Sequence, residues 1–198
     1  MGLLCPILQF AAENRRFTAR TAVSALGIVR TVDRVGCGSG LDLPYLPAQS
    51  AVLAVDFSAQ MLKQSADLQR QLQAQGHELA LTLRQGRAEQ SGLADHSVDL
   101  VLLHLILAVT DQPQALMEEA VRVLKPGGVI SIWDKFAPQR IGWLRRTADY
   151  LSRKLGTTLL LQIDPLLQPH SLAIMQRHTM LYGQMQHLIL SSNISVKR

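Results

Sequence analysis

Three glycines at alternate positions, Gly36, Gly38 and Gly40, are the residues whose spacing first suggests chemistry in this sequence. They follow a short run with an apolar end, residues 31–35. Because glycine has no Cβ, such a segment can turn sharply from a strand toward a helix and let a ligand lie against the backbone. Nucleotide-type cofactors are the best-known ligands of these turns. The nicotinamide fingerprint needs its third glycine one place later, where this chain has Leu41, so the spacing alone leaves a purely structural turn open.

A carboxylate stands at the end of the next apolar run, residues 51–56, which reads as a buried strand ending in Asp56. Side chains at the carboxyl ends of neighbouring parallel strands line the ligand crevice of an open sheet. A carboxylate there can accept hydrogen bonds from both hydroxyls of a ribose. Asp56 could instead cap the following helix, but Ser58 is better placed for that role. The glycine turn and Asp56 together favour a cofactor that contains adenosine.

Alternating strands and helices must position these residues. A lead-in helix is expected over 11–26, and Ser58 and Asp111 are expected to cap helices that end near Gln75 and Leu124. The segment Lys125–Gly128 is expected to turn the chain back. The strands are expected at 31–35, 51–56, 79–83, 98–103, 129–133, 172–176 and 184–190. The last two are joined so closely that they must pair antiparallel, and the rest indicates an α/β, doubly wound parallel sheet.

Composition narrows the class of protein. The chain has 198 residues, of which 47% are hydrophobic and 18% charged, which suits one domain with a buried parallel sheet and excludes a disordered chain. Its net charge of +5 permits an acidic partner without requiring one. Cys5 and Cys37 form no disulfide framework, so we expect a reduced, cytoplasmic chain. We expect no signal peptide at residues 1–6, which lack a basic region and a long apolar core, and no apolar run reaches the ~18 residues that a membrane span needs.

Five segments, taken together, resemble the class I S-adenosylmethionine-dependent methyltransferases in order and spacing. They are Val35–Gly40, Val55–Ser58 with Met61-Leu62, Gly86–Glu89, Asp95–Asp99 and Arg122–Gly128. The resemblance implies one methyltransferase domain over residues 1–198, with residues 1–30 and 135–170 covering the acceptor site. It also implies a Rossmann-like sheet of seven strands, mostly parallel with the last antiparallel, and S-adenosyl-L-methionine as cofactor. Within the family, residues 40–44 and 103–107 resemble members that methylate small molecules, including the phospholipid N-methyltransferase-like group.

The resemblance also implies which residues contact the cofactor. They are Gly36, Cys37, Gly38, Gly40, Asp56, Phe57, Met61, Ala88, Glu89 and Leu103. Asp56 would take the ribose hydroxyls, and the flat or polarisable side chains of Phe57 and Met61 would pack on the adenine. The backbone N–H of Ala88 would meet an adenine ring nitrogen, while Leu103 and His104 would leave the fourth strand near the sulfonium.

Two arginines depart from the family pattern. Arg34 stands where the family usually has a carboxylate, two residues before the first glycine. Asp33 is adjacent, but a shift of one residue points a side chain to the other face of a strand. Arg87 stands where the family usually has an aspartate that contacts the adenine amino group, and arginine has no acceptor. Both changes put cofactor affinity in doubt.

Methyl transfer asks little of the protein beyond holding a nucleophile in line with the methyl group and excluding water. A base is needed only where the acceptor keeps its proton, and His104 is the best-placed candidate. Its alternative role is a packed histidine at a strand end, or one that shapes the substrate site. The spacing of His170, His178 and His187 suggests no metal site, and we expect no metal.

Three functions remain open on the sequence. The first is a methyltransferase acting on a small-molecule or lipid-like acceptor, and the second is a binding protein that keeps the fold without catalysis, motivated by Arg34 and Arg87. The third, a nucleic-acid methyltransferase, lacks a basic stripe interleaved with aromatics, so we expect no nucleic-acid partner. Residues 141–155 carry an apolar stripe beside four basic residues, and Trp143 would mark the boundary of a peripheral membrane contact. An ordinary surface helix is the alternative for that segment.

Overall fold

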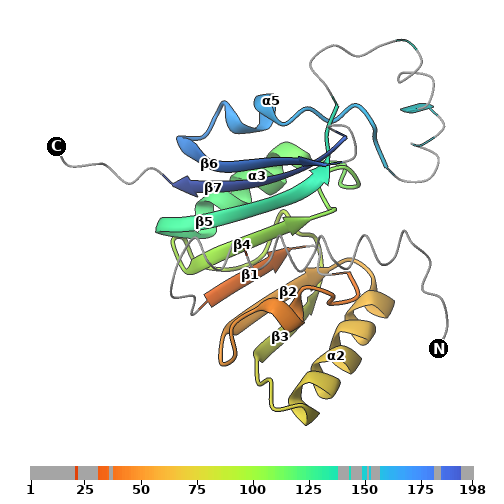
Figure 1. Cartoon of the computed structure of the whole chain (residues 1–198), viewed down its shortest axis with the longest axis vertical. Coiled ribbons are helices and arrows are strands. Elements are labelled where there is room, and N and C mark those ends of the chain that lie inside the picture. The colour runs from red at the N-terminus through yellow and green to blue at the C-terminus, as the bar shows by residue number, and fades with distance from the viewer. Residues whose placement is uncertain are drawn as a thin grey trace.

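The computed structural model describes residues 21, 31–35, 38–137, 143, 149–150, 152, 157–180 and 184–192. Seven strands form one sheet in the order β3-β2-β1-β4-β5-β7-β6 (Figure 1). They are β1 (Thr31–Val35), β2 (Ala51–Asp56), β3 (Ala80–Gln85), β4 (Val98–His104), β5 (Leu124–Lys135), β6 (Leu172–Met180) and β7 (Met185–Ser192). The helices whose full range the structure describes are η1 (Leu43–Tyr45), α2 (Ala59–Ala74), α3 (Pro113–Val123) and α5 (Asp164–Leu167).

The pairing of the strands confirms the predicted doubly wound, Rossmann-like sheet. Strands β1 to β5 pair in parallel, whereas β7 is antiparallel to both β5 and β6. In Figure 1 the arrowheads of β1, β4 and β5 point to the right and that of β7 points to the left. The chain runs outward from β1 to β2 and β3, then returns beside β1 as β4, so the order reverses between β1 and β4. Ligands of open α/β sheets bind outside the carboxyl ends of the strands at such a reversal.

The two faces of the sheet are buried by different helices. Along β4, Leu100 and Leu102 pack with η1 and the end of α2, while Val101 and Leu103 pack with α3 on the other face. All four side chains have no exposed surface. The middle of a strand buried on both faces must be apolar, which explains the run Leu100–Leu103 in the segment that predicted it.

Two expected boundaries are wrong. Asp111 does not cap α3, because Pro113 occupies the first helical position and makes Gln112 the residue before the helix. The segment Lys125–Gly128 does not form a separate turn but lies inside β5, where the register with β4 shifts between Val98 and Leu100. The predicted cap of α2 is confirmed, since the Ser58 hydroxyl accepts the N–H of Met61 at 3.3 Å. The lead-in helix expected over 11–26 lies outside the described residues, apart from a helical residue 21.

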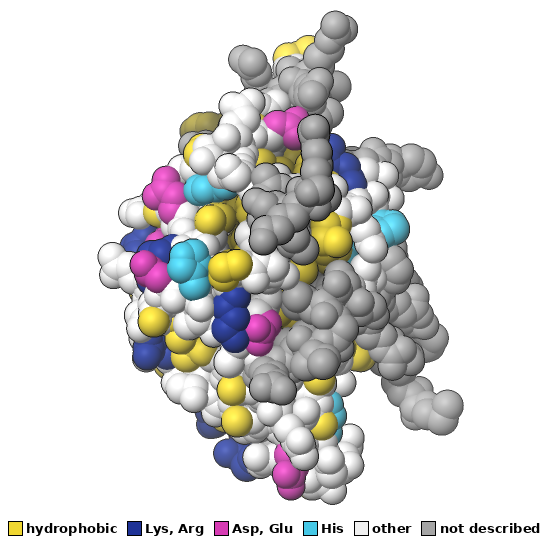
Figure 2. Space-filling view, turned by 90° about the vertical axis from the view of Figure 1, so that its left-hand side faces the viewer, with side chains coloured by type: hydrophobic (Ala, Val, Ile, Leu, Met, Phe, Trp, Pro, Cys, Tyr) yellow, Lys and Arg dark blue, Asp and Glu magenta, His cyan; other side chains and the backbone are white. Residues whose placement is uncertain are grey.

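Figure 2 views the molecule from the side where the amino ends of the parallel strands lie, opposite the carboxyl ends. Acidic, basic and histidine side chains intermingle there, without a large patch of one charge on the described part of this face (Figure 2). The ammonium of Lys125 lies 2.8 Å from Asp99 Oδ1 and also donates to the Thr31 hydroxyl at 3.0 Å. These contacts join the starts of β1 and β4 to the beginning of β5.

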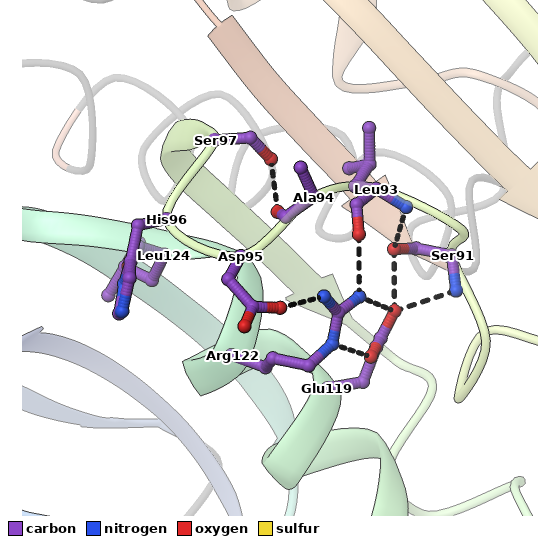
Figure 3. Close-up of polar contacts among 9 residues, drawn as sticks. All are labelled: Ser91, Leu93, Ala94, Asp95, His96, Ser97, Glu119, Arg122 and Leu124. Atoms are coloured by element: carbon purple, nitrogen blue, oxygen red, sulfur yellow. Dashed lines mark hydrogen bonds and ion pairs between the residues drawn. The ribbon is translucent and has the colours of Figure 1, made fainter.

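An ion-paired network holds the loop before β4 against α3 (Figure 3). The backbone N–H and hydroxyl of Ser91 donate to Glu119 Oε1 at 2.8 and 2.6 Å. Arg122 Nε donates to Glu119 Oε2 and its Nη2 donates to the Leu93 carbonyl, both at 2.8 Å, while Nη1 pairs with Asp95. Burial acts to raise the pKa of Glu119, but the hydrogen bonds from Arg122 and Ser91 outweigh it and lower that pKa below 4.5. The network fixes where β4 enters the sheet.

We predict that Glu119→Gln lowers the free energy of unfolding by about 1–3 kcal/mol at neutral pH, because it weakens charged hydrogen bonds to Ser91 and Arg122. A carboxylate whose pKa is lower in the folded chain stabilises it above the unfolded pKa and loses that effect as the pH falls through the folded pKa. The difference between parent and variant in urea denaturation should therefore shrink on acidification below pH 4.5. Glu118→Gln, which changes an exposed carboxylate of the same helix, is the control. If the difference in unfolding free energy between parent and Glu119→Gln does not change with pH, the Glu119 carboxylate does not stabilise the fold through its charge.

Candidate functional site

A cleft of about 470 Å³ opens at the carboxyl ends of the parallel strands. Segments that follow four strands line it. They are Gly38 after β1, residues 55–57 at the end of β2, residues 86–89 after β3, and residues 104–106 and 109–111 at and after the end of β4. This volume lies within the ~300–1,000 Å³ of small-molecule sites. The cleft therefore occupies the position that the strand order favours for a ligand.

The glycine turn brings the chain close to α2. Gly38 and Gly40 have φ angles of +50° and +82°, which side chains with a Cβ rarely adopt. A Cβ on Gly40 would lie 2.9 Å from the Ser65 hydroxyl and 3.1 Å from a methyl group of Leu43. Ser65 also donates its hydroxyl to the Gly38 carbonyl at 2.9 Å. Gly40 is thus required by contact with the protein, while Gly38 lines the cleft; Gly36 and Cys37 lie outside the described residues.

Asp56 is the carboxylate of the cleft wall. Its Oδ2 accepts the backbone N–H of Gly38 at 2.7 Å, and its Oδ1 accepts that of Ser58 at 2.9 Å. The side chain therefore connects the glycine turn with the start of α2. A carboxylate has about four acceptor positions, so these two bonds leave capacity for a ligand.

The other residues predicted to contact a cofactor divide into two groups. Phe57, which is 80% exposed, lines the cleft together with Ala88 and Glu89. Met61 lies in the first turn of α2, is 38% exposed and is not among the lining residues. Leu103 is fully buried in the core beside α3, so its side chain does not reach the cleft.

Arg87 lines the cleft beside its own counterion. Its Nε lies 3.5 Å from Glu89 Oε2, and the Thr110 hydroxyl donates to the other oxygen of the same carboxylate. Half of the Arg87 side chain is exposed, whereas that of Glu89 is 8% exposed. Glu89 thus links the loop after β3 with the loop after β4. The side chain of Arg34 lies outside what the structure describes.

The loop after β4 is held by the buried carboxylate of Asp134, at the end of β5. Its Oδ2 accepts the N–H of Ala108 at 3.1 Å, and its Oδ1 accepts the N–H of Lys135 at 2.7 Å. Burial raises the pKa of Asp134 to about 6, although these backbone bonds oppose the shift. This anchor fixes the backbone just before Val109, Thr110 and Asp111, which line the cleft.

His104 lies at the base of the cleft with both ring nitrogens engaged by the protein. Its Nδ1 lies 3.2 Å from Asp42 Oδ2, and its Nε2 lies 3.0 Å from the Ser131 hydroxyl. The same hydroxyl lies 3.0 Å from Nε2 of His187. All four side chains are at least 95% buried. These hydrogen bonds run from Asp42, two residues after Gly40, through β4 and β5 to β7.

Asp42 and His187, at the two ends of this series of hydrogen bonds, indicate which groups donate. A carboxylate accepts hydrogen bonds, so Nδ1 of His104 donates to Asp42. When His104 carries a single proton, on Nδ1, Ser131 donates its hydroxyl to Nε2 of His104 and accepts from Nε2 of His187. Burial lowers the pKa of His187 to about 3, as do the nearby His104 and His178, so His187 is neutral. In this arrangement neither nitrogen of His104 is free to remove a proton from a ligand.

Sequence reasoning selected His104 but missed its partners Asp42, Ser131 and His187. Ser131 and His187 are polar residues in apolar strands, and such residues need a partner when buried. That signal was available, but which residue each would meet depends on the register of β5 and β7. Within the described residues, no three His, Cys, Asp or Glu side chains are grouped as a metal site would require. None of the helices described by the structure has the length and apolar character needed to cross a bilayer.

Comparison with known proteins agrees with the geometry. Residues 34–132 match the family described as "Methyltransferase domain". A phosphatidylethanolamine N-methyltransferase from Cereibacter sphaeroides is 31% identical over 126 residues, which is 64% of this chain and 60% of that protein. A thiol S-methyltransferase from Homo sapiens is 30% identical over 113 residues, 55% of this chain and 44% of that protein. The chain thus spans less than two thirds of these relatives.

Among solved structures, a geranyl diphosphate methyltransferase in complex with S-adenosylmethionine has the same fold, with a TM-score of 0.72. The match covers 90% of this chain and 85% of that one at 13% identity. At such an identity the likeness concerns the fold.

The hydrogen bonds that join His104, Ser131 and His187 lead to a prediction about Ser131. Ser131→Ala should lower the free energy of unfolding by about 1–3 kcal/mol, because two buried imidazole nitrogens lose their partner. Chemical denaturation measures this loss. Ser97→Ala, which removes an exposed hydroxyl bonded to the Ala94 carbonyl, is the matched control and should lower the free energy of unfolding by less. Nitrogen NMR of the histidine rings should show the proton of His104 on Nδ1 in the parent chain; a proton found only on Nε2 would refute the assigned direction.

Proposed function

This chain belongs to the class I S-adenosylmethionine-dependent methyltransferase family, and we propose that it transfers a methyl group from S-adenosyl-L-methionine to a small or amphiphilic acceptor. The observation that carries the proposal is the position of Asp56. Its carboxylate stands in the wall of a cleft at the strand reversal, beside a glycine turn with no room for a side chain at Gly40.

The residues of the cleft suit this cofactor. Asp56 has acceptor capacity left for the ribose hydroxyls, and Phe57 offers a largely exposed ring for the adenine face. Ala88, after the neighbouring strand β3, also lines the cleft, and Gly38 leaves the turn open toward it. When bound, S-adenosyl-L-methionine supplies an activated methyl group, so the protein needs to orient the acceptor and exclude water.

We propose that His104 shapes the base of the cleft and does not act as a general base. Its nitrogens bind Asp42 and Ser131, which orients the ring and leaves its carbon edge to contribute to the wall. A polar wall group that is fully bonded to the protein presents an effectively apolar surface.

The substitution His104→Asn tests this role. A general base contributes typically ~10²–10⁴-fold to a rate. Asparagine keeps a donor for Asp42, so we expect the turnover number of His104→Asn to fall by less than the lower end of that range. A larger fall, accompanied by loss of the acidic limb of the pH–rate profile, would instead identify His104 as the base.

The relatives support two acceptor chemistries, a phospholipid amine and a thiol, as the names of the two proteins state. A lipid-like acceptor agrees with the exposed aromatic side chains of Trp143 and Tyr150, 73% and 71% exposed. Aromatic and basic residues are typical of segments that lie in a membrane interface. Peripheral membrane contact through residues 141–155 is therefore part of the proposal for such an acceptor.

A second candidate is a binding protein with little or no catalysis. Arg87 favours it, because a cation with no acceptor atom lines the cleft where an adenine amino group needs an acceptor. The ion pair with Glu89 weakens this argument against cofactor binding, because it draws the Arg87 guanidinium toward Glu89. Calorimetric binding of the cofactor followed by an assay for methyl transfer separates the two candidates.

We predict that Asp56→Ala weakens binding of S-adenosyl-L-methionine by about 1.5–3 kcal/mol, the range for hydrogen bonds to a charged group. Isothermal titration calorimetry measures the change. Asp67→Ala, on the exposed face of α2, is the control for removal of a carboxylate. Circular dichroism should report an intact fold for both variants. Unchanged affinity in Asp56→Ala would remove the observation on which the proposed function rests.

A further inference from the structure

A second cavity adjoins the proposed cofactor cleft. It has a volume of about 700 Å³ and lies between the loop after β4, the start of α3 and residues 157–166. Val109, Thr110 and Asp111 line both cavities. A molecule in the second cavity and a cofactor in the first would therefore meet at these three residues.

The wall of the second cavity is more apolar than its residue types suggest. Ala108, Pro113, Leu160, Leu161 and Leu166 supply much of it. Its threonine hydroxyls are already engaged: that of Thr110 donates to Glu89, that of Thr157 to the Ala108 carbonyl at 3.2 Å, and that of Thr158 to Asp149 at 2.8 Å. Apart from the amide of Gln162, the uncharged part of the described wall thus offers mainly an apolar surface to whatever occupies the cavity.

Asp111 is the exception. Of the described side chains that line the second cavity, it alone carries a charge. It is exposed, and within the described part of the chain no hydrogen bond or ion pair reaches its carboxylate. Since Pro113 moves the start of α3 forward, Asp111 is also released from the capping role that its sequence position suggested. A carboxylate with unused acceptor capacity therefore stands where the two cavities meet.

We propose that the second cavity binds the methyl acceptor and that Asp111 selects an amine carried on an apolar body. This inference rests on the proposed function and specifies its acceptor. The apolar body occupies the region of Leu160 and Leu161, and the amine donates a hydrogen bond to Asp111 beside the cofactor cleft. A charge-assisted bond of this kind both holds and orients the nitrogen.

The charge of Asp111 distinguishes an amine from a thiol. A thiol reacts as its thiolate, and a neighbouring carboxylate disfavours a second negative charge. An ammonium is attracted to the same carboxylate and must lose a proton to expose its lone pair. The proton passes by way of Asp111 to solvent, the new N–C bond forms as the S–C bond of the cofactor breaks, and the products are a methylated ammonium and a neutral thioether.

The test compares octylamine with octanethiol as acceptors for the full chain, with S-adenosyl-L-methionine binding measured separately by calorimetry. We expect octylamine to be methylated with the higher kcat/KM. Asp111→Asn should lower kcat/KM for octylamine by about 10- to 100-fold, the effect expected of a lost charged hydrogen bond, and leave octanethiol unchanged or improved. Glu118→Gln removes an exposed carboxylate of α3 that lines neither cavity, and it should leave kcat/KM unchanged for both substrates.

The outcomes separate this inference from the proposed function. Failure of the parent chain to bind the cofactor would overturn the proposed function and this inference with it. Cofactor binding with a preference for octanethiol, or with neither acceptor methylated, would overturn the amine site alone. An equal fall in kcat/KM for both acceptors in Asp111→Asn would show that Asp111 acts on the shape of the cavity. That result would also overturn the amine site.

Discussion

The carboxylate of Asp56 joins parts of the cleft that the chain builds separately. It ends β2, accepts the N–H of Gly38 from the turn after β1 and accepts the N–H of Ser58 at the start of α2. Without such a partner, these backbone donors would be left unsatisfied beside a partly buried turn, which is costly. One side chain can therefore shape the turn and still retain lone pairs for a ligand. The same geometry that stabilises the fold prepares the site.

Two further carboxylates hold the segment after β4, which forms another part of the cleft wall. Asp134 accepts the backbone N–H of Ala108, and Glu89 accepts the hydroxyl of Thr110. Both carboxylates lie on other strand ends or loops and hold the segment after β4, which separates the two cavities. Loops that carry function are usually mobile, and carboxylates bonded to their backbone reduce that mobility. The junction at Asp111 is thus positioned by anchors on both sides.

Much of the fold could be predicted from the sequence because buried parallel strands leave strong local signals. The middle of β4, Leu100–Leu103, is apolar on both faces, and the Ser58 hydroxyl caps α2 within the same turn. Features set by distant residues could not be predicted in the same way. The contact of His104 with Ser131 depends on the register of β4 with β5, and that of Ser131 with His187 depends on the pairing of β5 with β7. Leu103 points into the core because of the face on which β4 presents it. The cap of α3 moved because Pro113, two residues after Asp111, outweighed the capping preference of aspartate.

The hydrogen bond between Ser131 and His187 has a consequence for how the chain is made. It joins β5 to β7, the last strand that the structure describes, and passes through Ser131 to His104 at the base of the cleft. During synthesis the N-terminal part of a protein emerges and begins to fold first. Strands β1 to β5 can therefore pair on the ribosome, but Ser131 lacks its second partner until residue 187 has left the exit tunnel. Completion of the cleft is in this way tied to the synthesis of β7, and a nascent fragment that ends before β7 holds the glycine turn and Asp56 without a finished base beneath them.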